Sequence, residues 1–144
     1  MAILEGPWAA WNGLADGLRG EGLEVEWVSR DASQFLDVLG TNAPQVAVLD
    51  VESDGAATVG CSVTDGLNLL RGARKRQLEV RFLVISSVNS PGVMSQYFDE
   101  GAYGYLFRSG LGTSSVATAI HSVVRGERLF PVQRQVRRPH RPRC

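Results

Sequence analysis

The sequence predicts an α/β fold in which a five-stranded parallel sheet carries helices on both faces. Short apolar segments alternate with amphipathic segments, which is the strand and helix order of such a fold. The central apolar segments are hydrophobic at every position, as strands are when helices cover both faces of the sheet. The chain has 144 residues, of which 44% are hydrophobic and 21% charged, and these values are typical of one globular domain.

Five segments are predicted to be strands, in the order in which they occur. The second alternates between apolar and polar residues, which indicates a half-exposed strand near an edge. The last three are continuous apolar, β-branched or aromatic runs bounded by turn-forming residues. The predicted strands are residues 2–4, 23–28, 45–50, 80–86 and 103–107.

Five helices are predicted between and after these strands. Asp31 and Asp65 are expected to cap the second and third helices, and Gly40 to end the second. A Ser-Pro pair beginning at Ser90 is expected to start the fourth. The predicted helices are residues 9–20, 31–40, 65–76, 90–101 and 114–126.

Residues 51–64 form the one connection that is too long for this pattern, because such β-to-α connections usually have about 2–6 residues. The segment is rich in small and polar residues and has few bulky side chains. Little buried area would therefore offset the entropy lost on ordering it, and we expect it to be mobile. It is interpreted either as a functional loop or as a tolerated insertion.

Polar and charged residues follow four of the predicted strands. They are Glu5, Asp50, the pair Ser86 and Ser87, and Arg108. Ligands of open parallel sheets bind beyond the carboxyl ends of the strands, so these side chains mark the candidate site. Asp50 follows a buried run and needs a partner, which Arg108, Ser86 or a bound cation could supply. The alternative interpretation is a purely structural ion pair between Asp50 and Arg108.

Several segments together resemble a known family. QVAVLD (45–50), RFLVISS (81–87) and the stretch from EGAYGYLFRSGL to VVRGERLFP (100–131) resemble the receiver domain of bacterial two-component response regulators. The resemblance is strongest to the NarL/FixJ type, in which a LuxR-like DNA-binding module follows, and it covers residues 2–131. It implies a flavodoxin-like, three-layer sandwich around a five-stranded sheet.

The resemblance also implies roles for individual residues. Asp50 matches the aspartate that accepts a phosphoryl group from a histidine kinase, and Ser86 matches the hydroxyl that binds this group. Tyr105 matches the aromatic switch that swings inward on activation, and it could equally be an ordinary core residue. Arg108 stands where the family has a lysine. Glu5 and Asp50 are the candidate ligands of Mg²⁺.

Three departures from the family pattern lie around Asp50. Gly6 follows Glu5 where receivers have a second acidic residue, which predicts weak Mg²⁺ binding because Mg²⁺ needs a near-octahedral set of oxygen ligands. Arg108 keeps the positive charge of the family's lysine but not its compact ammonium group. Asp65 lies 15 positions after Asp50, where about seven are usual in the family. Together these departures predict a degenerate receiver.

The predicted function is therefore signal input to a transcription response regulator, through an atypical or phosphorylation-independent receiver that acts by protein contacts or dimerisation. Two alternatives stay open: a working phosphoacceptor at Asp50, and a regulatory domain that binds a small ligand at the same crevice. An enzyme is not predicted, since the sequence has no Gly-rich phosphate loop and no Ser/His/Asp set. His121 is expected on a helix surface.

The expected partners are a histidine kinase and a second copy of the chain. A homodimer would use the exposed edge of helix 114–126 or of the helix near Trp8 and Trp11. The apolar stripe of helix 114–126 could instead cover the sheet. It consists of Val116, Ala119, Ile120 and Val123.

Charge is distributed unevenly along the chain. Residues 132–144 hold five arginines and no acidic residue, whereas residues 1–131 hold the other ten basic and all fifteen acidic residues. We expect a receiver-like domain over 1–131 and a disordered basic tail or linker over 132–144. DNA contact is expected only through a module absent from this chain. No apolar run approaches the ~18–20 residues that cross a bilayer, so a cytoplasmic protein with no membrane contact is expected.

Overall fold

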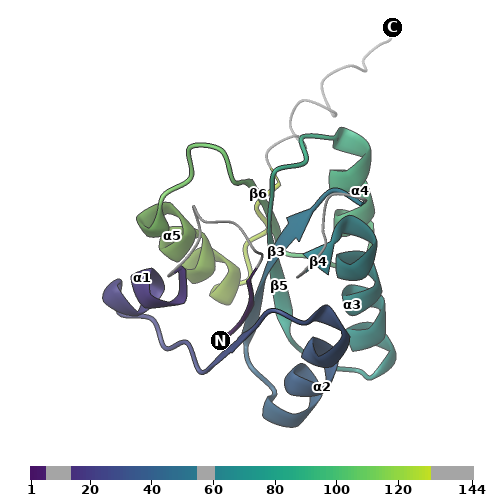
Figure 1. The fold of residues 1–144 in the computed structure, drawn as a ribbon, viewed down its shortest axis with the longest axis horizontal. Coiled ribbons are helices and arrows are strands. Elements are labelled where there is room, and N and C mark those ends of the chain that lie inside the picture. The colour runs from purple at the N-terminus through teal and green to yellow at the C-terminus, as the bar shows by residue number, and fades with distance from the viewer. Residues whose placement is uncertain (6–13, 55–60, 131–144) are drawn as a thin grey trace, which may run out of the picture.

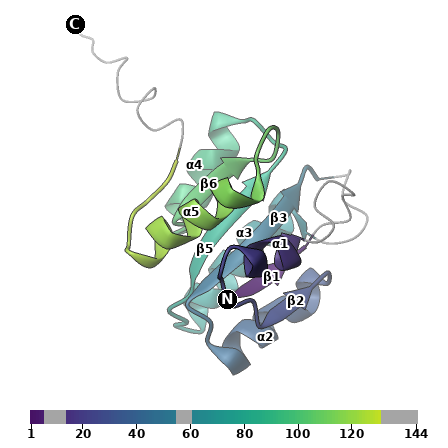
Figure 2. The same ribbon diagram turned by 90° about the vertical axis from the view of Figure 1, so that its left-hand side faces the viewer.

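The computed structural model describes residues 1–5, 14–54 and 61–130, and in these residues a parallel sheet lies between two layers of helices. Helices α1 and α5 cover one face, and α2, α3 and α4 cover the other (Figure 1 and Figure 2). The elements are β1 Ala2–Leu4, α1 Leu14–Gly20, β2 Trp27–Ser29, α2 Ala32–Asn42, β3 Val46–Glu52, β4 Cys61–Ser62, α3 Val63–Lys75, β5 Arg81–Ser86, α4 Pro91–Asp99, β6 Gly104–Phe107 and α5 Thr113–Val124.

The strand order β2-β1-β3-β5-β6 places β3 at the centre of the sheet, and every residue of β3 is buried. All strand pairs are parallel, which confirms the predicted sheet. The β3–β5 register runs from Val46 opposite Arg81 to Val51 opposite Ser86. Because the strands are parallel and in this register, the carboxyl ends of β3 and β5 meet at one edge.

All five predicted strands are present, and β4 is a further short strand that was not predicted. This two-residue strand pairs with β3, with Cys61 opposite Val51. It lies inside the segment 51–64 that was predicted to be a loop, and β3 also extends two residues past Asp50. Residues 55–60 of that segment lie outside the described residues, so the prediction of mobility stays a prediction.

Two helix ends also differ from their predictions. Helix α3 begins at Val63 because Ser62, rather than Asp65, is its N-cap: the Ser62 hydroxyl accepts a hydrogen bond from the Asp65 amide, and the Asp65 side chain accepts one from the Ser62 amide. Helix α2 passes through Gly40 and ends at Asn42, because Ala43 adopts the left-handed conformation (φ 48°) that closes the helix.

Other element predictions hold in the described residues. Asp31 caps α2 by accepting a hydrogen bond from the Ser33 amide, and Ser90 caps α4 with Pro91 in its first turn. Strand β2 lies at the edge of the sheet, as predicted, but covers only Trp27–Ser29. The part of the first predicted helix before Leu14 lies outside the described residues.

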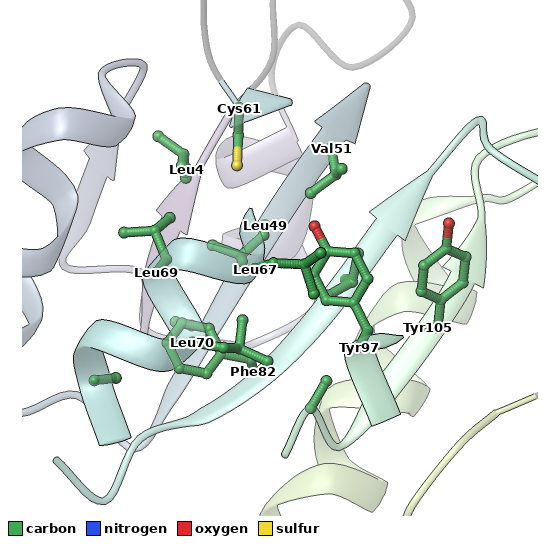
Figure 3. Packing of buried hydrophobic residues seen from close by; sticks show 14 of the residues in the cluster. Leu4, Leu49, Val51, Cys61, Leu67, Leu69, Leu70, Phe82, Tyr97 and Tyr105 are labelled. Carbon is green, nitrogen blue, oxygen red and sulfur yellow. The ribbon is translucent and has the colours of Figure 1, made fainter. Parts of the chain in front are cut away.

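Two apolar clusters fill the spaces between the sheet and its helices. Figure 3 shows part of the larger cluster, in which Leu49 and Phe82 of the sheet lie near Leu67 and Leu70 of α3. The smaller cluster packs α1 and α5 against the other face. It buries the whole predicted stripe of α5, so these four side chains cover the sheet and are not available as a dimer surface: Val116, Ala119, Ile120 and Val123. In the described part of the chain, no helix is long and apolar enough to cross a membrane.

Candidate functional site

The predicted site residues of β3, β5 and β6 come together at the carboxyl ends of these strands. Asp50 precedes Val51, which lies opposite Ser86, and Ser86 in turn lies opposite Phe107, the residue before Arg108. Asp50 and Ser86 are buried, and the side chain of Arg108 is only 11% exposed. A charged group that is this buried needs a partner close by.

Arg108 is the partner of Asp50. Its Nη2 donates to Oδ1 of Asp50 and to the Val51 carbonyl oxygen at 3.2 Å, and its Nη1 donates to Oε2 of Glu52 at 2.7 Å. Side chains two apart on a strand point to the same face, so β3 presents both carboxylates to one guanidinium. The sequence-based interpretation of an Asp50–Arg108 ion pair is therefore confirmed, with Glu52 as a second acidic partner.

Glu52 is a site residue that was not predicted from the sequence. Its Oε1 accepts a hydrogen bond from the Ser87 hydroxyl at 2.6 Å, so both carboxylate oxygens are engaged. Burial acts to raise the pKa of Glu52, but the hydrogen bonds from Ser87 and Arg108 and the charge of Arg108 outweigh it, and the pKa lies below its ordinary value of 4.5. Glu52 is therefore an anion at neutral pH.

Ser86 and Tyr105 are joined through the backbone of Val88. The Val88 amide donates to the Ser86 hydroxyl oxygen at 2.9 Å, and the Tyr105 hydroxyl donates to the Val88 carbonyl at 2.8 Å. Neither Ser86 nor Tyr105 has exposed surface. Burial raises the pKa of the Tyr105 hydroxyl, and a hydrogen bond with Ser86 and the charge of Arg108 partly offset this rise.

Glu5 lies directly after β1, on the strand beside β3. Its carboxylate is buried, and Oε2 accepts a long hydrogen bond from the Ala15 amide at 3.4 Å. Oε1 is 3.7 Å from Nη2 of Arg30. Both carboxylate oxygens of Glu5 thus face N–H donors, one from Ala15 and one from Arg30. Gly6 lies outside the described residues.

The described residues do not fit the predicted Mg²⁺ site. Mg²⁺ is held through oxygen ligands in near-octahedral geometry, and it usually retains several waters. Here Asp50 binds a guanidinium and Glu5 faces Arg30. Within residues 1–5, 14–54 and 61–130, no group of three His, Cys, Asp or Glu side chains could hold a metal ion. The positive charge beside Asp50 is supplied by Arg108.

A hollow of about 560 Å³ opens beside Arg108 and its two carboxylate partners, Asp50 and Glu52, between the carboxyl ends of β5 and β6. Three serines, an asparagine and an arginine line it, together with one aromatic residue and a glycine. The lining residues are Ser86, Ser87, Asn89, Phe107, Arg108, Ser109 and Gly110.

A search of protein-family models found no match to this chain. Among curated proteins, the chain is 27% identical over 90 residues to the probable transcriptional regulatory protein NarL of two Mycobacterium tuberculosis strains, CDC 1551 and H37Rv. The match covers 62% of this chain and 38% of the length of each relative.

Solved structures of receiver domains share the fold. The receiver domain of the putative response regulator NarL from Mycobacterium tuberculosis superposes with a TM-score of 0.70 at 21% identity, covering 88% of this chain and 96% of that one. The isolated receiver domain of RcsB from Salmonella enterica serovar Typhimurium gives 0.73 at 17% identity, covering 94% and 96%. A LuxR-family response regulator from Staphylococcus aureus gives 0.71 at 17% identity, covering 85% and 96%. The chain therefore has the fold of a response regulator receiver domain, and it is similar in sequence to a NarL-type regulator.

Proposed function

We propose that this chain is the signal-input domain of a NarL-type transcription response regulator and that it works without phosphorylation of Asp50. The observation that carries the proposal is the Arg108 guanidinium between Asp50 and Glu52. The family's lysine would be a compact point charge, whereas the arginine binds two carboxylates at once. The acceptor aspartate is thereby held in a buried ion pair.

Two features of this ion pair oppose phosphoryl transfer to Asp50. Attack on a phosphorus atom through Oδ1 of Asp50 would break its contact with Arg108, and a buried charge that loses its partner is strongly destabilised. The product would carry about −1.5 to −2 charge next to the ionised Glu52, and like charges repel strongly in a buried site. Among residues 1–5, 14–54 and 61–130, no group of three His, Cys, Asp or Glu side chains could hold a cation that would offset this repulsion.

The position of Tyr105 also supports the proposal. The resemblance implies that this aromatic residue moves inward on activation. The Tyr105 ring is already fully buried, and its hydroxyl donates a hydrogen bond to the Val88 carbonyl. In the proposed function, the domain keeps this arrangement and regulates through contacts with other proteins.

The partners of the whole regulator follow from this proposal. A second copy of the chain and a histidine kinase are the proposed protein partners, the kinase acting by contact rather than by phosphotransfer. DNA would be contacted by a module outside the 1–131 domain. The basic residues 132–144, which lie outside the described residues, are proposed as a tail or linker.

A phosphotransfer assay tests the proposal. We expect no phosphoryl adduct when the protein is incubated with acetyl phosphate and Mg²⁺ and its intact mass is measured. A receiver with a complete acidic site, treated in parallel, shows that the reagents are active. Combining Glu52→Gln with Arg108→Lys removes the second carboxylate and restores the family's cation, so this variant is expected to gain an adduct. A stoichiometric adduct on the unmodified sequence that disappears in Asp50→Asn would contradict the proposal and favour a working phosphoacceptor.

A small-ligand-binding regulatory domain is the second candidate function. The hollow beside Arg108 favours it, because its volume of about 560 Å³ falls within the ~300–1,000 Å³ of small-molecule sites. Its hydroxyl groups and the amide of Asn89 could orient a polar ligand against the ring of Phe107.

A further inference from the structure

A groove opens at the edge of the sheet opposite the candidate site. It lies where β1, β2 and β3 begin, at the edge marked by the letter N in Figure 1, and its volume is about 360 Å³. Its apolar floor includes Trp27 of β2, Ile120 of α5, and Leu23 and Pro44 from the connections that precede β2 and β3. This hollow is called the amino-end groove below.

Two glutamates give the amino-end groove an acidic rim. Glu24 and Glu26 line it, and both are exposed. The amino group of Met1 donates to the Glu24 carbonyl at 3.2 Å and forms an ion pair with the Glu26 carboxylate. The groove therefore combines an apolar floor with a rim that already binds one ammonium group.

The carboxylate of Glu24 is unusual among the acidic side chains of this domain. In residues 1–5, 14–54 and 61–130, the carboxylates without a hydrogen-bond or ion-pair partner are those of Glu21, Glu24, Glu79 and Asp99. Of these four residues, only Glu24 lines the amino-end groove. The groove thus presents a negative charge that the described residues do not neutralise.

The chain beyond Phe130 carries the complementary charge. Ten basic and fifteen acidic residues give residues 1–131 a net charge of −5, whereas the five arginines of residues 132–144 give that segment +5. Val132 and Val136 stand four positions apart among these arginines. The segment therefore offers cationic and apolar groups together, which match the rim and the floor of the groove.

The basic segment is long enough to reach the groove. Leu129 bridges Gly104, Gly104 lies opposite Leu83, and Leu83 lies opposite Val48, two residues after Val46 at the groove. Three strand spacings and two residue steps put Leu129 roughly 16 Å from Val46. Residues 131–144 can span up to about 46 Å when extended, so they can turn back and cover this distance.

We propose that residues 132–144 bind in the amino-end groove of their own chain. The arginines lie against the carboxylates of Glu24 and Glu26, and the valines contact the apolar floor. Because the segment is tethered, its effective concentration at the groove is about millimolar, and individually weak contacts suffice. Bound in this way, the segment is withheld from other acidic or phosphate-bearing molecules, so the contact regulates access to its arginines.

This inference goes beyond the proposed function. The groove lies at the amino ends of the strands, whereas Asp50 and Arg108 lie at the carboxyl ends. The contact requires neither an unphosphorylated Asp50 nor its ion pair with Arg108. A positive phosphotransfer assay would therefore leave it unaffected.

A nitroxide spin label on Cys144 of the full chain tests the proposal. Cys61 is buried and burial raises the pKa of its thiol, so a thiol reagent labels Cys144 selectively. The label broadens the amide NMR signals of residues near it. Val46 lines the groove and Val51 lies near the other end of β3, so the ratio of their intensities reports where the label lies.

We expect the Val46 signal to lose intensity relative to Val51 at low salt. The loss should disappear at about 1 M salt, where the Debye length falls to about 3 Å. Equal intensities of Val46 and Val51 at low salt would overturn the proposal. This comparison uses the unmodified sequence and decides the proposal even if a variant fails to fold.

A pair of charge reversals separates the groove from general attraction to an acidic domain. Glu24→Lys should restore the Val46 intensity, whereas Asp99→Lys should not, although it changes the net charge equally. Asp99 follows Phe98, whose ring packs on Phe130, so it lies close to the start of the basic segment. Equal recovery in both variants would show that net charge alone attracts the segment and that the groove is not its site.

Reversing the charge of the segment tests the contact from the other side. Arg137→Glu combined with Arg138→Glu should restore the Val46 intensity, and adding Glu24→Lys should bring part of the loss back. If the reversed segment still broadens Val46, its arginines do not hold it in the groove and the proposal is wrong.

A mixed sample distinguishes the chain's own segment from that of a second copy. Spin-labelled protein without ¹⁵N is mixed with ¹⁵N-labelled protein that carries no spin label. We expect the Val46 signal of this mixture to keep its intensity. Broadening in the mixture equal to that in the singly prepared protein would assign the groove to the segment of a second copy and overturn binding within one chain.

Discussion

At the scale of single residues, the site depends on the shape of the arginine side chain. A guanidinium is planar and offers several N–H donors in a fixed fork, so Arg108 can bind Glu52 through Nη1 and Asp50 through Nη2. An ammonium could neutralise charge at one point but could not span both carboxylates in this geometry. The change from lysine to arginine therefore alters what the site can do, although the charge is the same.

Removing this guanidinium should be strongly destabilising. Arg108→Met leaves Asp50 and Glu52 buried without their common cation, and breaking a buried ion pair on one side typically costs about 3–5 kcal/mol. The free energy of unfolding, measured by urea titration at neutral pH, checks this. Arg71→Met is the control, because Arg71 pairs with Glu100 at the surface with 48% of its side chain exposed. Exposed pairs contribute about 0–1 kcal/mol.

The loss in free energy of unfolding caused by Arg108→Met should depend on pH. In the folded wild type the pKa of Glu52 is held below 4.5, so Glu52 contributes stability that is present above pH 4.5 and is lost as the pH falls through its folded pKa. Without Arg108, only the remaining hydrogen bonds oppose the effect of burial on the pKa of Glu52. Protonation of the Glu52 carboxyl group then stabilises the folded variant. The difference between wild type and variant should therefore shrink below about pH 4.5. A constant difference down to acidic pH would mean that Glu52 and Arg108 are not coupled.

At the scale of helices and strands, the sequence is informative where the pattern is long and repeated. The apolar runs that became β3, β5 and β6 were predictable because burial on both faces requires uninterrupted apolar residues. Strand β4 was not predictable, because two residues carry no periodicity. The true start of α3 was missed because Asp65 is also a good N-cap type, and only the reciprocal hydrogen bonds identify Ser62.

The candidate site was predictable to a similar extent. Asp50, Ser86, Tyr105 and Arg108 could be placed at one edge of the sheet, because each lies at or near the carboxyl end of an apolar strand. Glu52 was missed because β3 was expected to end at residue 50. Its signal was the period of two along a strand, which puts residue 52 on the same face as Asp50 if the strand continues.

At Gly66, the packing of α3 against Tyr97 of α4 outweighs helix propensity. Replacing a helical glycine by alanine usually favours the helix by about 1 kcal/mol. At Gly66 of α3, however, a Cβ would lie 2.2 Å from the Tyr97 hydroxyl, which is itself bonded to the Val63 carbonyl. We expect Gly66→Ala to lower the melting temperature. Gly40→Ala in α2 should not lower it, because that Cβ meets only Arg76 Nη1 at 3.5 Å.

Changing Tyr97 tests whether its hydroxyl causes the expected loss of stability in Gly66→Ala. Tyr97→Phe removes the atom nearest to the new methyl group, so the double variant Gly66→Ala with Tyr97→Phe should lose less stability than the two single changes added together. Strict additivity in thermal unfolding would show that the loss has another origin.

At the scale of the whole molecule, little apolar surface is left open. Among the described residues, the exposed large hydrophobic side chains are Val28 and Val124, which are 43% and 36% exposed. Val28 lies opposite Ile3 in the β1–β2 register, and aligned residues of neighbouring strands point to the same face of the sheet. Ile3 packs with α1 and α5, so Val28 and Val124 belong to the same side of the molecule.

Association of two copies is predicted to be independent of phosphorylation. The family resemblance implies pairing, and under the proposed function Asp50 carries no phosphoryl group that could trigger it. Sedimentation velocity at micromolar concentration should therefore give the same dimer with and without acetyl phosphate and Mg²⁺. The side of the molecule formed by α1 and α5 carries Val28 and Val124, so Val124→Asp should shift the distribution toward monomer. Thr118→Asp is the control, because Thr118 is an exposed residue of the same helix but is not a large hydrophobic side chain, and it should shift the distribution less. A purely monomeric protein under both conditions would exclude the dimer and leave regulation to contacts with other proteins.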